Sequence, residues 1–200
     1  PVPNSNTTPT QGARILSKAP QVHVMLQGKG GVGKSLGSAL IGQWHQVKGV
    51  PFSMFDTDPV NATLSGYRAL PVTRLELLDE ENRLDTRRFD QLMEAIVAER
   101  QNVVIDNGAA SFLPLSHYFV ENSVPEFLAS QGRELVIHST VTGGQAMLDT
   151  LSGLSSLCTQ MQNEARIVVW LNEYFGPIKA EGKNFEDMRV YVENRERISG

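Results

Sequence analysis

The residues best suited to carry chemistry lie in one short run, Gln27-Gly28-Lys29-Gly30-Gly31-Val32-Gly33-Lys34-Ser35. Gly28, Gly33, Lys34 and Ser35 occupy the fixed positions of the pattern G-x-x-x-x-G-K-[ST]. Glycines allow the backbone to turn its N–H groups toward an anion, the lysine reaches the outer phosphates, and the hydroxyl binds Mg²⁺. The run therefore predicts a phosphate-binding loop (P-loop), with a glycine-rich turn that binds nothing as the structural alternative.

Three aspartates are candidates for metal and water chemistry. Asp56 and Asp58 follow one short apolar run, and Asp106 ends another. Side chains at the carboxyl ends of strands lie on the ligand side of an α/β sheet, and Mg²⁺ prefers oxygen ligands and keeps much of its hydration shell. We expect Asp56 to help organise a Mg²⁺ environment and Asp106 to hold a metal-bound water. For Asp58, which precedes a proline, capping of a helix is the structural alternative.

Hydrophobic patterns indicate the elements that would position these residues. Residues 22–26 form a short apolar run suited to a buried strand, and residues 36–47 repeat apolar side chains at helical spacing. The loop would thus lie at a helix N-terminus, where the dipole favours phosphate. The alternating elements predict an α/β fold with a doubly wound, mostly parallel sheet. Further strands are expected at 52–55, 71–78, 102–106, 134–140 and 166–171, and further helices at 86–100, in broken form over 112–131, at 147–161 and near the C-terminus.

Length and composition are typical of one sizeable domain. The chain has 200 residues and 40% hydrophobic content, enough for a core of that size. Residues 1–19 contain several Pro, Asn, Thr and Ser residues with little apolar content, so we expect a flexible leader there. Residues 20–200 would form the nucleotide-binding domain.

Charge and cysteine content exclude some classes of protein. The net charge of −4 gives no electrostatic reason to expect strong DNA binding, with a local basic patch left as an alternative. Arg83, Arg87 and Arg88 alternate with acidic residues, which is typical of a solvated face. Cys158 is the only cysteine, so the chain has no intrachain disulfide and no cysteine metal cluster, which suits a reducing cytoplasm. No apolar run approaches the roughly 18 residues of a transmembrane segment, and no signal pattern is present.

The run K-G-G-V-G-K-S resembles the deviant Walker A motif of the ParA/MinD family of P-loop ATPases. In that family the first lysine reaches the partner's nucleotide across a dimer interface, so the resemblance implies an ATP-sandwiched dimer in which Lys29 has this role. A solvated loop lysine is the alternative. Residues 56–63 resemble switch I, in which Asp58 would position the attacking water, and residues 107–111 would be switch II. Relatives often contact the nucleotide base with an amide side chain, which suggests Asn172 as the adenine contact, although Asn also commonly ends strands. The sequence lacks the guanine-binding pattern N-K-x-D, which favours ATP over GTP.

A narrower resemblance covers nearly the whole chain from residue 22. The runs that carry it are L-Q-G-K-G-G-V-G-K-S at 26–35, D-T-D-P-V-N-A-T at 56–63, V-I-D-N-G-A at 104–109, T-G-G-Q at 142–145 and V-W-L-N-E-Y-F-G-P at 169–177. They are similar to the TraL family of plasmid conjugal-transfer proteins, which have a ParA-like nucleotide-binding domain. The polar leader departs from this pattern. The chain also stops where relatives usually add another strand and helix, so we expect a truncated C-terminal end.

These resemblances imply a P-loop NTPase fold of the ParA/MinD type and a slow Mg²⁺-dependent ATPase switch, weak without a partner. It would dimerise with ATP, release ADP, and serve conjugal transfer with other transfer proteins in the bacterial cytoplasm, or at the membrane through a partner. A plasmid-partition ATPase that binds DNA nonspecifically and a nucleotide-binding scaffold without hydrolysis are alternatives, whereas electron transfer lacks the paired cluster ligands. The expected catalytic residues are Asp58, Lys29 and Lys34; the nucleotide-binding residues are Gly28, Lys29, Gly30, Gly31, Val32, Gly33, Lys34, Ser35, Leu36 and Asn172; the Mg²⁺ residues are Ser35, Asp56 and Asp106.

Overall fold

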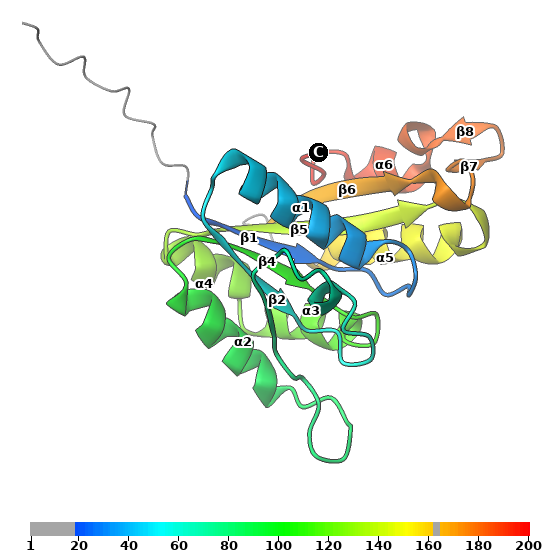
Figure 1. Ribbon diagram of the computed structural model, residues 1–200. Helices are drawn as coiled ribbons and strands as arrows, with labels where there is room; N and C mark the ends of the chain where they lie inside the picture. Colours follow the sequence, from blue (N-terminus) through cyan, green and yellow to red (C-terminus); the bar gives the residue numbers. More distant parts are fainter. Residues whose placement is uncertain (1–18, 162–164) are drawn as a thin grey trace, which may run out of the picture.

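The computed structural model describes residues 19–161 and 165–200, and every structural statement below refers to these residues. A six-stranded sheet runs through its centre in the order β3-β2-β4-β1-β5-β6, and every neighbouring pair is parallel (Figure 1). The predicted α/β fold is confirmed, whereas the predicted leader lies outside the described residues except for Ala19. The strands are β1 (Gln21–Met25), β2 (Phe52–Asp56), β3 (Val72–Arg74), β4 (Asn102–Asp106), β5 (Glu134–Thr142) and β6 (Ala165–Asn172).

Helices cover both faces of the sheet, as a doubly wound fold requires. Figure 1 shows α1 across one face, with α2 and α4 along the other. The main core lies on the second face, where the apolar side chains of β1, β4 and β5 meet those of α2, α3, α4 and α5. The helices are α1 (Lys34–Lys48), α2 (Arg87–Ala98), α3 (Phe112–Glu121), α4 (Val124–Ser130), α5 (Met147–Gln160) and α6 (Arg189–Asn194). Shorter elements are the 3-10 turns η1 (Leu64–Gly66), η2 (Gly144–Ala146), η3 (Glu173–Phe175) and η4 (Phe185–Asp187), and the hairpin strands β7 (Lys179–Ala180) and β8 (Lys183–Asn184).

Helix α1 lies where the pattern predicts, but most of its larger apolar side chains face outward. Trp44 and Val47 are 55% and 84% exposed. The buried side carries Ile41 together with several small residues. A Cβ on Gly37 would lie 2.6 Å from Met25 Cε, and one on Gly42 would lie 2.5 Å from Met54 Sδ. Glycine thus allows α1 to approach the sheet closely.

No helix in the described part of the chain is both long and apolar enough to cross a membrane.

The predicted terminal helix is present as α6, but it begins only at Arg189. Phe185 begins the 3-10 turn η4, and Met188 is extended, with φ −74° and ψ 146°, before α6 starts. Both side chains are buried against α5 and β6, whereas Val192 is 52% exposed. Two of the apolar residues on which the prediction depended therefore lie outside the helix.

A chain of three rings, two buried and one half-buried, ties β6 to β5 and β1. Trp170 Nε1 donates to His138 Nδ1 at 2.9 Å, and His138 Nε2 lies 2.9 Å from His23 Nδ1. Because indole can only donate, His138 must carry its proton on Nε2 and donate it to His23. Burial, together with the charge of Arg166, lowers the pKa of His138 to about 4. The contact therefore requires a neutral His138.

Candidate functional site

The loop between β1 and α1 has the geometry of an anion cradle. Gly31 and Gly33 have positive φ angles of 73° and 98°, which side chains other than glycine rarely adopt. Gly33 directly precedes α1, so the loop ends at a helix N-terminus, where free N–H groups and the dipole favour an anion. The Lys34 side chain is buried, its Nζ donates to Lys29 O at 2.9 Å, and burial lowers its pKa. The Lys34 side chain and the backbone N–H donors thus lie in one loop.

A cavity of about 580 Å³ beside this loop brings most of the predicted site residues together. The parallel register explains why, since Asp106 pairs with both Met25 and Asp56 and the three strands therefore end together. The P-loop, switch I and switch II all reach this edge of the sheet. The lining residues are Gly30, Gly31, Gly33, Lys34, Ser35, Leu36, Asp58, Val60, Asn61, Thr63, Tyr67, Ala109 and Ala110.

Asp106 is buried with an incomplete set of hydrogen bonds. Ser38 Oγ donates to its Oδ1 at 3.1 Å, whereas Oδ2 has no hydrogen-bond partner among the described residues. Burial raises the pKa of Asp106 to about 6, with a contribution from the charge of Asp56, against the nearby hydroxyl groups of Ser35 and Ser38. A buried carboxylate oxygen without a partner is costly, and it suits a cation with oxygen ligands.

Asp56 uses both carboxylate oxygens to hold switch I. Its Oδ1 accepts from Asp58 N at 3.2 Å, and its Oδ2 accepts from Ser65 N and Ser65 Oγ at 2.9 and 2.8 Å. The side chain is fully buried. Asp56 thus acts on the segment that follows it, and its predicted role at Mg²⁺ stays a prediction.

Asp58 caps a local turn rather than a helix. Its Oδ1 accepts from Val60 N at 2.9 Å and from Asn61 N at 3.0 Å, but no helix begins at Pro59, so the alternative of a helix cap is wrong, while the predicted role in positioning water stays a prediction. The residue also lines the cavity opposite Lys34 and Ser35. The carboxylate therefore lies at the site, with one oxygen engaged by its own turn.

Lys29 is one of the predicted residues that do not line the main cavity; the others are Gly28, Val32, Asp56, Asp106 and Asn172. Its Nζ lies 2.7 Å from Asp149 Oδ2 of α5, and the two side chains are 45% and 59% exposed. Both residues line a second cavity of about 690 Å³ between the P-loop, α3 and α5. An exposed pair of this kind holds its partners weakly.

Asn172 reaches the P-loop from the end of β6. Its Nδ2 donates to Val32 O at 3.0 Å, and its Oδ1 accepts from Tyr174 N at 3.1 Å. A Cβ on Gly33 would lie 3.1 Å from this amide. Asn172 therefore supports the loop, while its predicted contact with a base stays a prediction.

Gln27 has a supporting role that sequence reasoning missed. Its Nε2 donates to Thr140 O at 3.0 Å and to Thr150 O at 3.1 Å, and its Oε1 accepts from Gly28 N at 2.8 Å. The side chain is 1% exposed. It fits because residue 153 is glycine, since a Cβ there would lie 2.4 Å from Oε1. The one signal in the sequence is a polar residue between an apolar strand and the loop.

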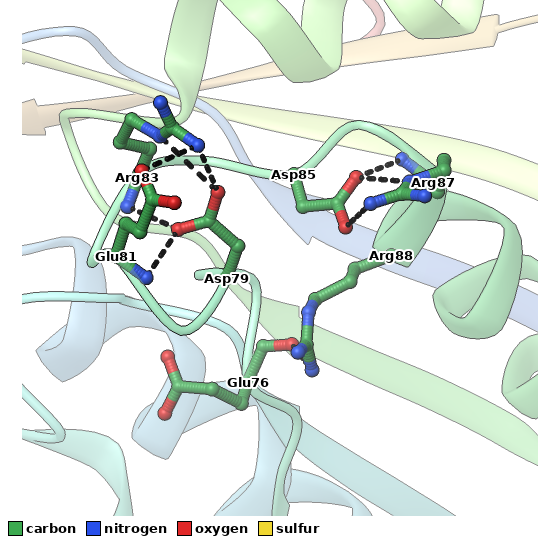
Figure 2. Close-up of polar contacts among 7 residues, drawn as sticks. All are labelled: Glu76, Asp79, Glu81, Arg83, Asp85, Arg87 and Arg88. Carbon is green, nitrogen blue, oxygen red and sulfur yellow. Dashed lines mark hydrogen bonds and ion pairs between the residues drawn. The ribbon is translucent and has the colours of Figure 1, made fainter.

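The charged segment between β3 and α2 contributes no residue to the main cavity. Figure 2 shows Asp79 facing Arg83, and Asp85 facing Arg87. The two arginine side chains are 69% and 85% exposed, and the backbone N–H of Arg83 holds the pKa of Asp79 below its usual value. These arginines thus pair with acidic residues of their own loop, as expected for a solvated face.

Comparisons with known proteins place the chain in a family. No family model matches it. Among solved structures, it resembles the MinC:MinD cell division complex of Aquifex aeolicus (16% identity, 74% of this chain and 68% of that chain, TM-score 0.45) and a plasmid partition protein of Borrelia burgdorferi (14%, 90% and 85%, TM-score 0.42). Two proteins of Escherichia coli, each named Protein TraL, are 53% and 51% identical over 179 residues, which are 90% of this chain and 74% of each relative. The chain therefore belongs to the TraL family.

Proposed function

We propose that this protein is a Mg²⁺-dependent switch that binds ATP, hydrolyses it slowly and dimerises while ATP is bound. The observation that carries the proposal is the convergence of Lys34, Ser35 and Asp58 on one cavity at the N-terminus of α1. Backbone N–H groups and a lysine at a helix N-terminus are what polyphosphate binding requires. The proposed place of action is the bacterial cytoplasm.

The unpartnered Oδ2 of Asp106 suits a metal-bound water, so Asp106 and Ser35 would hold Mg²⁺, with Asp56 organising the surrounding loop. When bound, the ion would neutralise negative charge on the phosphate oxygens. Lys34 and the loop N–H groups would contribute further positive charge to the same oxygens.

Asp58 is the residue proposed to orient the attacking water. It faces the P-loop across the cavity, and its Oδ2 takes no part in the turn bonds to Val60 and Asn61. A carboxylate in this place orients a nucleophile by accepting its hydrogen bond. Hydrolysis would be slow while one oxygen remains engaged in the turn.

Lys29 is proposed to act on the nucleotide of a second copy. Its exposed pair with Asp149 costs little to break, and it lies beside the open cavity between the P-loop and α5. A dimer across this face would bring two such lysines to two nucleotides. Membership of the TraL family favours service to conjugal transfer, with other transfer proteins as partners.

One observation favours a second candidate function, a nucleotide-binding scaffold that does not hydrolyse ATP. Asp58 Oδ1 accepts two backbone N–H bonds, and such a capping role needs no catalysis. The two candidates differ in phosphate release, which the scaffold would not show.

Sedimentation with Mg-ATP and Mg-ADP, run beside a phosphate-release assay, tests the proposal. We expect dimers with ATP only, dimers that persist in Asp58→Ala because hydrolysis is lost, and monomers in Lys29→Ala. Asp79→Ala is the matched control, because Asp79 also accepts two backbone N–H bonds in a turn but lies in the charged loop. Monomers under every condition would overturn the dimer proposal, and phosphate release unchanged by Asp58→Ala would overturn the role of that residue.

A further inference from the structure

Asn107, which the proposed chemistry does not use, is the centre of a buried polar ring in switch II. Its Oδ1 accepts from Ser111 Oγ at 2.8 Å and its Nδ2 donates to Gly108 O at 3.1 Å, while Ser111 Oγ also lies 3.3 Å from Gly108 O. Asn107 is 1% exposed and Ser111 is fully buried. Buried polar groups keep their partners because water cannot replace them, so this ring fixes the shape of the segment.

The ring holds Gly108 against the proposed catalytic carboxylate. A Cβ on Gly108 would lie 2.6 Å from Asp58 Oδ1 and 2.9 Å from Pro59 Cδ, so the two switch segments touch at a point that only glycine allows. Thr57 makes a second connection, because its Oγ1 donates to Asp106 O at 3.0 Å and lies 3.4 Å from Asn107 Oδ1. Switch I thus contacts Asn107 through Thr57, and Gly108 through Asp58 and Pro59.

The same ring lies directly before α3. Ser111 directly precedes α3, and the first residue of that helix, Phe112, packs on the P-loop, since a Cβ on Gly28 would lie 2.8 Å from Phe112 Cδ1. The next residue, Leu113, is 54% exposed and borders two surface cavities. A path from Asp58 through Gly108, Asn107, Ser111 and Phe112 therefore leads to the exposed side chain of Leu113.

We propose that Asn107 is a positioning residue that holds Asp58, through Gly108, in a fixed relation to the first turn of α3. This inference rests on the proposed function. Nucleotide in the main cavity would act on Asp58, and the ring would carry the resulting change to α3. The relation is reciprocal, so a change at the start of α3 must alter switch I by the same free energy.

Hydrogen exchange tests the coupling without relying on activity. Wild type is measured alone and with Mg²⁺ and a non-hydrolysable ATP analogue, and exchange is followed in residues 28–36, 58–66 and 111–116. Ser111→Ala removes the hydroxyl that closes the ring, and Ser111→Thr keeps one. Ser116→Ala is the matched control on the same helix, because its buried hydroxyl has no hydrogen-bond partner among the described residues.

We expect the analogue to slow exchange in all three segments of wild type. Ser111→Ala should reduce the effect at 58–66 about fivefold, the factor that corresponds to one buried hydrogen bond, while residues 28–36 respond as before. Ser111→Thr should restore the effect. Thr57→Val, which is isosteric, should reduce the effect at 111–116 from the other end.

Two outcomes would contradict the reasoning in different ways. If Ser111→Ala responds like Ser116→Ala in every segment, the ring does not couple the two regions and the inference is wrong, while the proposed function stands. If the analogue changes nothing at residues 28–36 of wild type, the loop does not bind nucleotide, and the proposed function and the inference fall together.

Discussion

Replacing Asp106 with asparagine should shift the stability of the nucleotide-free protein, relative to wild type, in favour of the variant as the pH rises from 4.5 to 8. Burial raises the pKa of this carboxyl to about 6, from 3.8 in the unfolded chain. A raised carboxyl pKa means that stability is fully present below the unfolded value and is lost as the pH rises through the folded value. The loss amounts to about 3 kcal/mol above pH 6, because each pKa unit corresponds to about 1.4 kcal/mol.

The variant Asp106→Asn cannot ionise, so it escapes this loss. It also retains an oxygen for Ser38 Oγ and leaves a buried amide without a partner, but these terms do not change with pH. The difference in unfolding free energy between variant and wild type should therefore shift by about 2 kcal/mol in favour of the variant between pH 4.5 and pH 8. For a domain of this size, that is an increase of about 4 to 8 °C in the difference of unfolding temperatures.

Urea and thermal unfolding of both proteins without Mg²⁺ would measure this difference. Comparing the variant with wild type removes the contribution of His138 to the unfolding free energy, because that contribution is the same in both proteins. It varies over part of the same pH range. Asp56→Asn is the matched control and should lower the unfolding temperature at pH 8, because an amide donor would then face Ser65 N–H. An Asp106→Asn difference that stays constant from pH 4.5 to pH 8 would refute the raised pKa, and with it the argument that this site awaits a cation.

Three further predictions concern stability. Burial lowers the pKa of His138 to about 4, so stability that is present above the unfolded pKa of 6.5 should be lost as the pH falls toward 4. Urea titrations should show a loss of up to about 3 kcal/mol, and His138→Phe should abolish it. Because the Lys29 pair is exposed, Asp149→Ala should lower the unfolding temperature by no more than about 3 °C, and a larger drop in calorimetry would contradict the exposed geometry. Gly143→Ala would place a Cβ 2.1 Å from Gly176 O, and should cost more than about 2 kcal/mol in chemical denaturation; wild-type stability would show that the backbones can separate.

Much of the site was predictable because its residues are consecutive in the chain. A P-loop needs fixed spacing between glycines, lysine and serine, and that spacing is visible as Gly28 to Ser35. The ends of β2 and β4 were predictable in the same way, since Asp56 and Asp106 each close an apolar run. Short-range geometry thus identified the loop and two of the aspartates.

The support around the site could not be predicted, because it joins residues that are far apart in sequence. Gln27 reaches Thr150, and Asn172 reaches Val32 across 140 positions. A single glutamine or asparagine carries no pattern that indicates such a partner. The glycines that make room for these contacts, such as Gly153, likewise show no periodicity.

The sequence by itself determined the α/β class, the order of strands and helices, and the position of the glycine-rich loop between β1 and α1, because these depend on local spacing and on apolar periodicity. The tertiary structure alone decided which face of α1 is buried, where Lys29 points and how Asn107 ties Asp58 to α3. Those features depend on whether a neighbouring strand leaves room for a side chain and on which buried polar groups find partners. Both are set by close packing between distant segments, which has no counterpart in local spacing.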